Sequence, residues 1–136
     1  KGDYIRSFGY VKVLKGGKEF YFATTHLDHK YEDAARLLQI NEILSHVEQL
    51  DLPVILGGDL NSRRGSATME AFQRYFTVNC LSDGAPWTVP APNPTYACDW
   101  LIYAPNKAFV VKAYNVCYWA DKESDHFPVT ATYVIR

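Results

Sequence analysis

The stretch LPVILGGDLN, residues 52–61, places an apolar run directly before two glycines, an aspartate and an asparagine. The run from Leu52 to Leu56 predicts a short buried strand. On an extended backbone, residues i and i+2 point to the same side, so Asp59 and Asn61 should project together from the carboxyl end of this strand. Ligand sites gather at that end of the strands in α/β sheets. A plain turn is the alternative, because Gly, Asp and Asn are also the commonest turn residues.

The composition is that of one globular domain with a substantial core. The chain has 136 residues, of which 48% are hydrophobic, and its aromatic content of 15% suits a fold that contains β-sheet. No stretch is long enough to predict a membrane span, and the N-terminus reads as the interior of a longer chain rather than as a signal peptide. The net charge of −1 argues against non-specific binding of nucleic acid, but it leaves a small phosphorylated substrate open.

The three cysteines do not form a metal-binding pattern. Cys80, Cys98 and Cys117 are far apart, and no two of them are separated by only two residues. A structural zinc site is therefore not expected. Burial as small hydrophobic residues is the favoured interpretation, and a single disulfide remains open.

The first half of the chain predicts a strand–helix–strand unit. Residues 8–14 and 19–27 predict a hairpin around a glycine turn at 15–18. Residues 31–50 predict a helix, whose apolar positions at helical spacing are Leu37, Ile40, Leu44 and Val47. The strand that ends at Asp59 follows, which is the pattern of an α/β layer.

The second half predicts a short helix and three more strands. Ser66 is a candidate N-cap for a helix over residues 68–76. Residues 81–94 contain four prolines and predict an irregular surface loop. Strands are expected over residues 95–103, 109–119 and 127–135.

Polar residues of the types that take part in catalysis and metal binding occur at or just beyond the ends of these strands. They are His26, the pair Asp59 and Asn61, Asp99, and the pair Asp125 and His126. Each has a structural alternative: a satisfied histidine, a capping aspartate or ordinary loop polarity. A carboxylate at Asp99, within an apolar run, is costly to bury without a partner, and His126 is a candidate for that partner.

Together these residues favour hydrolysis. His126, if oriented by Asp99, would act as a general base for water. Asp125 and Asp59 are hard oxygen ligands of the kind that Mg²⁺ or Mn²⁺ prefers, and His26 and Asn61 could donate hydrogen bonds to phosphate oxygens. The sequence contains no nucleophile elbow, no zinc-protease motif and no P-loop.

Four ordered motifs resemble those of the endonuclease/exonuclease/phosphatase superfamily. They are Thr25–Leu27, Gly58–Asn61, Asp99–Ile102 and Ser124–Pro128. The superfamily includes deoxyribonuclease I, inositol polyphosphate 5-phosphatases, neutral sphingomyelinases and deadenylases. The resemblance covers nearly the whole chain and implies an α/β deoxyribonuclease I-like fold, a four-layer sandwich of two mixed β-sheets flanked by helices. It also implies Mg²⁺-dependent cleavage of phosphoester bonds.

The resemblance assigns roles to individual residues. His26 would contact phosphate, Asp59 and Asn61 would orient the attacking water and the phosphate, and Asp125 would belong to the metal site. Asp99 and His126 would form the carboxylate–histidine pair, with His126 as the expected base and Asp59 as the alternative. Two further residues are candidates for substrate binding: Thr95, which resembles a threonine that often lines this site, and Arg63, which could reach a phosphate or simply be solvated.

Two departures from the superfamily pattern matter. Its N-terminal half, which carries an Asn and a Glu that bind metal, has no counterpart, so residues 1–136 are expected to be the C-terminal half of such a domain. The sheet would then expose an inner apolar face that needs the other half or a second copy as a partner. Cys98 occupies a position where many relatives carry a basic or other polar residue.

The leading functional hypothesis is a metal-dependent phosphoesterase acting on a phosphorylated small molecule or a phosphodiester, with nucleic acid less favoured because of the charge. The alternative is a catalytically silent module of the same fold that binds a ligand or a partner. The sequence does not fix the compartment, and secretion or a periplasmic location would require a signal removed with an upstream segment.

Overall fold

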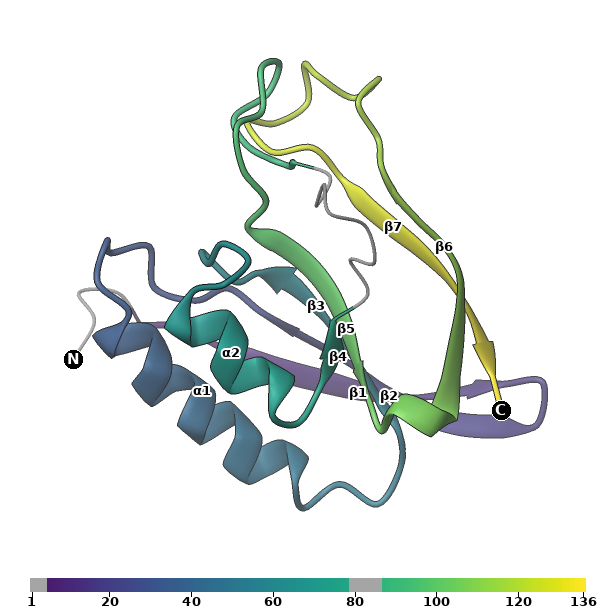
Figure 1. Cartoon of the computed structure of the whole chain (residues 1–136). Coiled ribbons are helices and arrows are strands. Elements are labelled where there is room, and N and C mark those ends of the chain that lie inside the picture. The colour runs from purple at the N-terminus through teal and green to yellow at the C-terminus, as the bar shows by residue number, and fades with distance from the viewer. Residues whose placement is uncertain (1–4, 79–86) are drawn as a thin grey trace.

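The computed structural model describes residues 5–78 and 87–136. The elements in chain order are β1 (Phe8–Lys15), β2 (Lys18–Thr25), α1 (Ala34–Val47), β3 (Val54–Asp59), α2 (Ala67–Gln73), β4 (Thr77–Val78), β5 (Asp99–Ala104), a 3-10 turn (Asn106–Ala108), β6 (Phe109–Val116) and β7 (Val129–Ile135). The described strands form a five-stranded sheet in the order β1-β2-β3-β5-β4 and a separate hairpin of β6 and β7 (Figure 1). No helix in the described ranges is long and apolar enough to cross a membrane.

The pairing of the central strands brings three strand ends to one edge of the sheet. β1 and β2 form the expected hairpin, with Gly16 and Gly17 at positive φ in its turn. β2 and β3 are parallel, connected through α1, whereas β3 and β5 are antiparallel. The carboxyl ends of β2 and β3 therefore lie beside the amino end of β5, and Asp59 is the register partner of Asp99.

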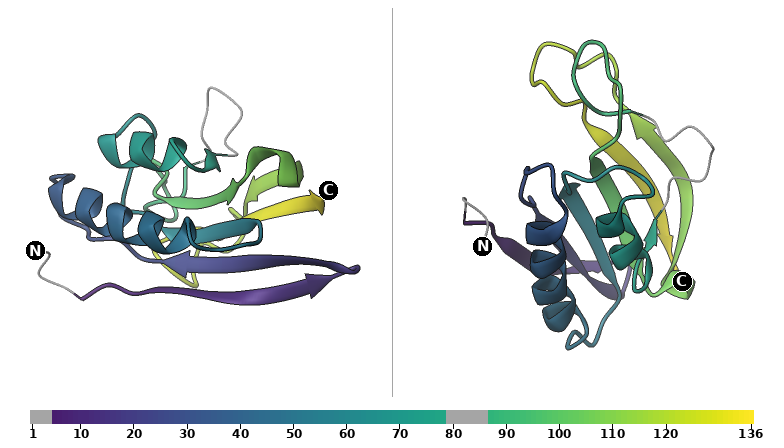
Figure 2. Two further views of the ribbon diagram at one scale, coloured as in Figure 1. Left: turned by 90° about the horizontal axis from the view of Figure 1, so that it is seen from below. Right: turned by 60° about the vertical axis from the view of Figure 1, so that its left-hand side comes forward.

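The two helices cover one face of the five-stranded sheet (Figure 2). Their buried side chains pack against alternate residues of the strands, because successive strand residues point to opposite faces. Leu56 of β3, Ile40 of α1 and Phe72 of α2 are all fully buried in this cluster. Trp100 and Ile102 of β5 join them. The main core thus lies between sheet and helices, and the polar strand ends lie at its margin.

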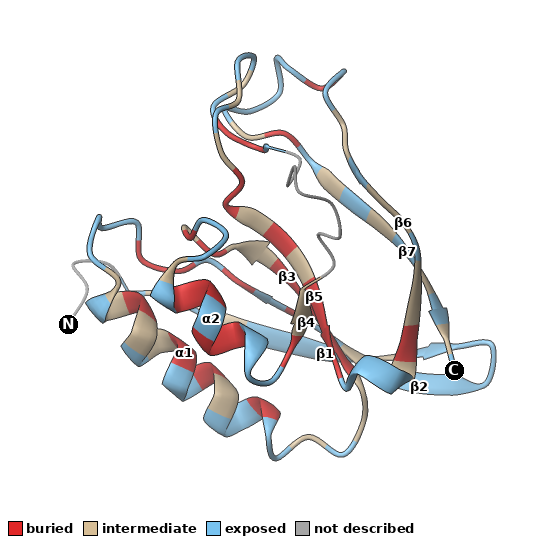
Figure 3. Cartoon of the chain, viewed as in Figure 1, coloured by how far each residue is buried: buried red, intermediate tan, exposed pale blue. Residues whose placement is uncertain are grey.

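The opposite face of the sheet is only partly covered. Ile55, Tyr103 and Phe109 form a second, smaller cluster where the β6–β7 hairpin folds over the sheet. Beyond the hairpin this inner face is open: Val11 is 61% exposed and Phe22, its register partner, is 42% exposed. Figure 3 shows the same contrast between buried β5 and exposed β1. The hairpin therefore shields part of the apolar face that the sequence predicts to be exposed.

Several predicted elements are shorter than expected. The helix predicted over residues 31–50 spans Ala34–Val47, and the strand predicted over 95–103 begins only at Asp99, because Tyr96 instead pairs with Val89 in an isolated bridge. Thr88 is 1% and Val89 7% exposed, so this described part of the predicted surface loop is buried. Residues 79–86 of that region, including Cys80, lie outside the described residues. Cys98 and Cys117 are both free thiols.

Candidate active site

Asp59 reaches the site because two glycines precede it at the end of β3. A Cβ atom on Gly58 would lie 1.9 Å from the carbonyl oxygen of Thr25, so only a glycine allows β2 to approach this closely. Leu27 N donates to Asp59 O at 3.0 Å and continues the contact between the two chain segments beyond the strands. The close approach places the residues that follow β2 against the end of β3.

Asn61 does not continue the extended strand. β3 ends at Asp59, and Asn61 has a φ of 46°, in the left-handed region that asparagine tolerates. Its backbone N–H donates to Asp59 Oδ1 at 2.8 Å, and its side-chain Nδ2 donates to Leu27 O at 3.0 Å. The rule that residues i and i+2 share a face therefore does not apply to this pair. The two side chains are held by the turn instead.

His26 lies beside Asp59 at the end of β2. Its Nε2 is 3.3 Å from Asp59 Oδ2, and its side chain is 55% exposed, compared with 16% for Asp59. The imidazole thus borders solvent, while the carboxylate sits deeper in the site. The structure therefore brings His26, Asp59 and Asn61 together at one edge of the sheet.

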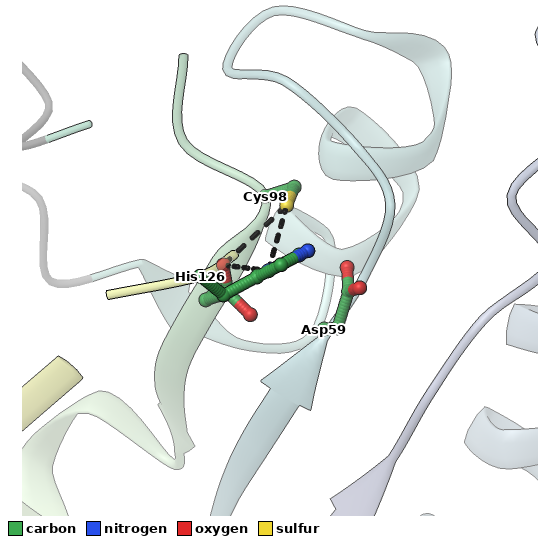
Figure 4. A group of neighbouring side chains, drawn as sticks. Asp59, Cys98 and His126 are labelled. Atoms are coloured by element: carbon green, nitrogen blue, oxygen red, sulfur yellow. Dashed lines mark hydrogen bonds and ion pairs between the residues drawn. The ribbon is translucent and has the colours of Figure 1, made fainter. Parts of the chain in front are cut away.

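Asp99 and His126 form a hydrogen-bonded pair next to Asp59. His126 Nδ1 lies 2.9 Å from Asp99 Oδ2, and the same oxygen accepts a 2.6 Å hydrogen bond from Thr88 Oγ1. The backbone N–H of His126 donates to Ser124 Oγ at 3.1 Å. In Figure 4 the imidazole extends from this contact toward the side of the site where Asp59 lies. The Asp99 carboxylate, which is itself held by the Thr88 hydroxyl, fixes the orientation of the His126 ring.

The surroundings of His126 favour its charged form. Partial burial acts to lower the pKa of His126, but the hydrogen bond and charge of Asp99 oppose it, with further contributions from Asp59 and Asp125. The net result is a pKa raised above the ordinary value of 6.5. An imidazolium formed at this position is therefore stabilised by the carboxylates around it.

The thiol of Cys98 lies against the same pair. Cys98 is 2% exposed, and its Sγ is 3.4 Å from Asp99 Oδ2 and 3.8 Å from His126 Nδ1. Burial, followed by the charges of Asp99 and Asp59, raises the pKa of the Cys98 thiol far above its usual range. One ligand atom from each of Asp59, Cys98, Asp99 and His126 lies within 4.8 Å of the others.

A cavity of about 440 Å³ opens onto this group between the inner sheet face and the segment that leads into β7. Asp59, Asp99 and His126 are its titratable lining residues, and Phe22 and Leu101 are among its apolar walls. None of the described residues that line it is a lysine or an arginine. The cavity therefore presents carboxylates and an imidazole to a bound molecule, without a positively charged wall.

Besides His26 and Asn61, three predicted site residues lie outside the group of four. Asp125 is exposed, and its Oδ1 accepts a 3.4 Å hydrogen bond from Ser124 Oγ. Thr95 is exposed, and Arg63 lies with its guanidinium carbon 4.1 Å from the ring centroid of Tyr96.

Two residues at the site were not predicted as functional from the sequence. Thr88 lies in a segment that reads as a loop, and no local pattern links it to Asp99. Cys98 had a visible signal, because it directly precedes Asp99, but it was interpreted as a small buried hydrophobic residue. The contact of Thr88 with Asp99 and that of Cys98 with His126 depend on how separate segments pack.

Comparisons with known proteins agree with the two-sheet fold. A mannosyl-6-phosphatase of Bacteroides thetaiotaomicron is 26% identical, with a TM-score of 0.74 over 96% of this chain and 57% of its own. An endonuclease/exonuclease/phosphatase family protein of the same species is 24% identical, with a TM-score of 0.74 over 96% of this chain and 55% of its own. Sphingomyelinase C 1 of Leptospira interrogans is 37% identical over 73 residues, which cover 46% of this chain and 12% of that protein. No protein-family model matches the sequence.

The fold has the deoxyribonuclease I-like architecture of these solved structures. The chain shares the fold of solved endonuclease/exonuclease/phosphatase family proteins, which agrees with the resemblance of its four sequence motifs to that superfamily. It spans little more than half the length of the solved structures that it matches, and a much smaller share of the sphingomyelinase.

Proposed function

We propose that the protein is a metal-dependent hydrolase of phosphoester or phosphodiester bonds, in which the Asp99–His126 pair activates water. The observation that carries the proposal is the 2.9 Å contact between His126 Nδ1 and Asp99 Oδ2 beside the cavity. A histidine that donates from Nδ1 to a carboxylate keeps Nε2 free to accept a proton. Asp99 would hold this tautomer and stabilise the imidazolium that forms.

The oxygen donors at the site fit magnesium. Mg²⁺ in enzymes is typically held by one or two carboxylates together with waters and substrate phosphate. Asp59 would supply one carboxylate, and Asp125, next to His126 in the chain, would supply another. When bound, the ion would neutralise charge on the phosphate oxygens. Mn²⁺ has the same preference for oxygen ligands and is the alternative.

The remaining polar groups would bind the phosphate. Asn61 uses one Nδ2 hydrogen for Leu27 O, which leaves the second for a substrate oxygen. His26 borders solvent beside Asp59 and could donate to another. Thr95 and Arg63 would contact the substrate farther from the reacting bond, and for Arg63 this requires the guanidinium to leave the face of Tyr96.

A small phosphorylated molecule is the substrate class best supported. The lack of basic side chains among the described cavity residues and the net charge of −1 both disfavour a long polyanion. Two of the similar proteins are named for action on a sugar phosphate and on sphingomyelin. Nucleic acid remains the less favoured alternative.

We further propose that residues 1–136 form the C-terminal half of a larger catalytic domain. The exposed apolar surface around Val11 and Phe22 supports an additional layer of protein on the inner face of the sheet. That layer would be either the N-terminal half of the domain or a second copy of this chain.

The proposal is tested by hydrolysis of a substrate panel with Mg²⁺, with Mn²⁺ and with EDTA. The panel contains a generic phosphodiester, sugar and inositol phosphates, sphingomyelin and plasmid DNA. We expect metal-dependent turnover that falls at least about 100-fold in His126→Ala, because loss of a general base removes a factor of this order. His46→Ala is the matched control, since His46 lies on α1, 56% exposed and outside the site.

The opposite outcome would favour a different function. If the folded chain shows no turnover, the assay is repeated with the longer polypeptide that includes the upstream half. Continued absence of turnover there would contradict the enzyme proposal in favour of a silent binding module. Turnover that is equal in His126→Ala and wild type would contradict the role of the Asp99–His126 pair.

A further inference from the structure

A sulfur, a nitrogen and an oxygen converge at the back of the cavity. Cys98 Sγ, His126 Nδ1 and Asp99 Oδ2 form a triangle with sides of 2.9, 3.4 and 3.8 Å. Asp59 belongs to the same group, in which one ligand atom from each of the four residues lies within 4.8 Å of the others. The thiol is what distinguishes this group from an ordinary carboxylate–histidine pair.

The triangle has the size of one face of a tetrahedral zinc site. With usual bond lengths to sulfur, nitrogen and oxygen, tetrahedral ligands lie about 3.6 Å apart for S···N, about 3.5 Å for S···O and about 3.3 Å for N···O. The corresponding distances here are 3.8, 3.4 and 2.9 Å. Three ligands could therefore meet one ion with only small movements of their side chains.

We propose that Cys98, Asp99 and His126, with Asp59 or water as the fourth ligand, form a binding site for a thiophilic divalent cation such as Zn²⁺ or Cd²⁺. A thiolate and an imidazole favour these ions, whereas Mg²⁺ requires a shell of oxygen ligands. Binding would place the ion on the thiolate and on Nδ1 of a neutral imidazole. The thiol proton would leave to solvent, and the imidazole proton would move from Nδ1 to Nε2.

The surroundings supply the support and the access that such a site needs. Thr88 Oγ1 donates to Asp99 and accepts from the backbone N–H of Cys98 at 3.2 Å, so it helps to orient two of the ligand residues. The side chains of Asp99 and His126 are 20% and 30% exposed and border the cavity, through which an ion could enter. Figure 4 shows Cys98 and Asp59 on different sides of the His126 ring.

The consequence for catalysis rests on the proposed function. An ion on Nδ1 leaves the imidazole proton on Nε2, and this tautomer cannot take a proton from water. The hydrogen bond from Nδ1 to Asp99 is lost at the same time. Zinc would therefore inhibit the hydrolase through Nδ1 of His126, a group that is not among the ligands proposed for magnesium.

Binding is tested by titrating the metal-free chain with Cd²⁺ and following the ultraviolet charge-transfer absorption of a cadmium–thiolate bond. We expect one equivalent to bind in the wild type and in Cys117→Ser, the matched control at the other described free thiol. Cys98→Ser should lose the absorption, and the remaining ligands should bind Cd²⁺ at least about 100-fold more weakly. Excess Mg²⁺ should not displace the ion.

A second variant keeps the test decisive if Cys98→Ser does not fold. His126→Ala removes a partly exposed ligand, and we expect it to retain the thiolate absorption but to weaken binding by a similar factor. The proposal would be overturned if the absorption were missing in the wild type or survived in folded Cys98→Ser. It would also be overturned if His126→Ala bound Cd²⁺ with unchanged affinity.

Inhibition is measured separately, as the fraction of each variant's own zinc-free rate. We expect Zn²⁺ added to the Mg²⁺ assay to inhibit wild type and Cys117→Ser but not Cys98→Ser. If neither the chain nor the longer polypeptide has turnover, the function proposal fails while the cadmium titration still decides the metal site. Equal inhibition of all three variants would overturn the inhibitory role of the site.

Discussion

The close contact between the ends of β2 and β3 depends on the absence of a side chain at Gly58. The carbonyl oxygen of Thr25 occupies the space that a Cβ atom would need. Both Asp59 and the residues after β2 owe their positions to this approach, because Leu27 N–H bonds to Asp59 O directly beyond it. A glycine here is a packing requirement on which the geometry of the site depends.

Gly58→Ala should therefore destabilise the protein by about 3 kcal/mol, through overpacking against Thr25 and a φ of 155°. Urea unfolding followed by fluorescence gives the difference. Gly9→Ala in β1 is the matched control, since a Cβ there meets no atom within 4 Å, and it should change stability by less than about 1 kcal/mol. Equal effects of both substitutions would contradict the steric explanation.

The Asp99–His126 contact predicts a specific titration. In metal-free protein, the pKa of His126 followed by NMR should lie above 6.5, and Asp99→Asn should lower it, because the hydrogen bond and charge of the carboxylate are removed. The pair stabilises the fold fully below the unfolded pKa near 6.5, and this contribution is lost as pH rises through the higher folded pKa.

Asp51→Asn serves as the control for that titration, because Asp51 is exposed and bonds to Tyr21 instead. It should leave the titration of His126 unchanged. An unaltered His126 titration in Asp99→Asn would show that the contact does not set the charge state of the ring.

At the scale of the element, α1 is anchored by a charged residue on its buried side. Leu37, Ile40, Leu44 and Val47 were the predicted apolar face, but Arg36 is also buried, at 4% exposure. Its guanidinium donates to a set of acceptors in the loop before the helix and on α2: the carbonyls of Asp28, Lys30 and Tyr31, the Asp33 carboxylate and the Thr68 hydroxyl. α1, the loop after β2 and α2 are thus joined through one side chain.

Arg36→Met should cost about 3–5 kcal/mol, because it removes the charged partner of the Asp33 carboxylate and the donor of several carbonyls. Thermal and urea unfolding measure the loss. Arg74→Met, at an exposed arginine just beyond α2, should change stability by less than about 0.5 kcal/mol. A small effect of Arg36→Met would mean that water replaces the guanidinium without penalty.

At the scale of the whole molecule, the two faces of the five-stranded sheet are covered to different extents. α1 and α2 seal one face, whereas the β6–β7 hairpin covers only part of the other. Apolar side chains around Phe22 and Val11 remain exposed next to the cavity. An exposed apolar surface on a sheet favours association with further protein.

The chain by itself should therefore associate reversibly in sedimentation experiments. Phe22→Ser should weaken this association about tenfold, or about 1.4 kcal/mol, because it removes an apolar contact from the open face. Leu38→Ser, at a residue of α1 that is 63% exposed, is the control and should have no effect. A strictly monomeric chain, or equal effects of both variants, would contradict the role of this face.

Local pattern was sufficient for many of the elements. The glycine turn of the β1–β2 hairpin, the N-cap of α2 at Ser66 and the strand that ends at Asp59 were all predicted and are all observed. These features depend on neighbours in the chain, through turn chemistry, capping and hydrophobic periodicity. Element ends were less well predicted, because Tyr96 pairs with Val89 rather than extending β5.

The sequence by itself determined which residue types stand at the strand ends, because alternation and turn residues are local. Only the tertiary structure decided that Asp59 pairs in register with Asp99, that Thr88 bonds to Asp99 and that the sulfur of Cys98 contacts the pair. The contacts of Asp99 with Asp59 and Thr88, and that of Cys98 with His126, form when separate segments of the chain pack together, and no local pattern encodes their register. Burial then excludes water from charges that would otherwise be solvated, and this changes the pKa values of the groups at the site.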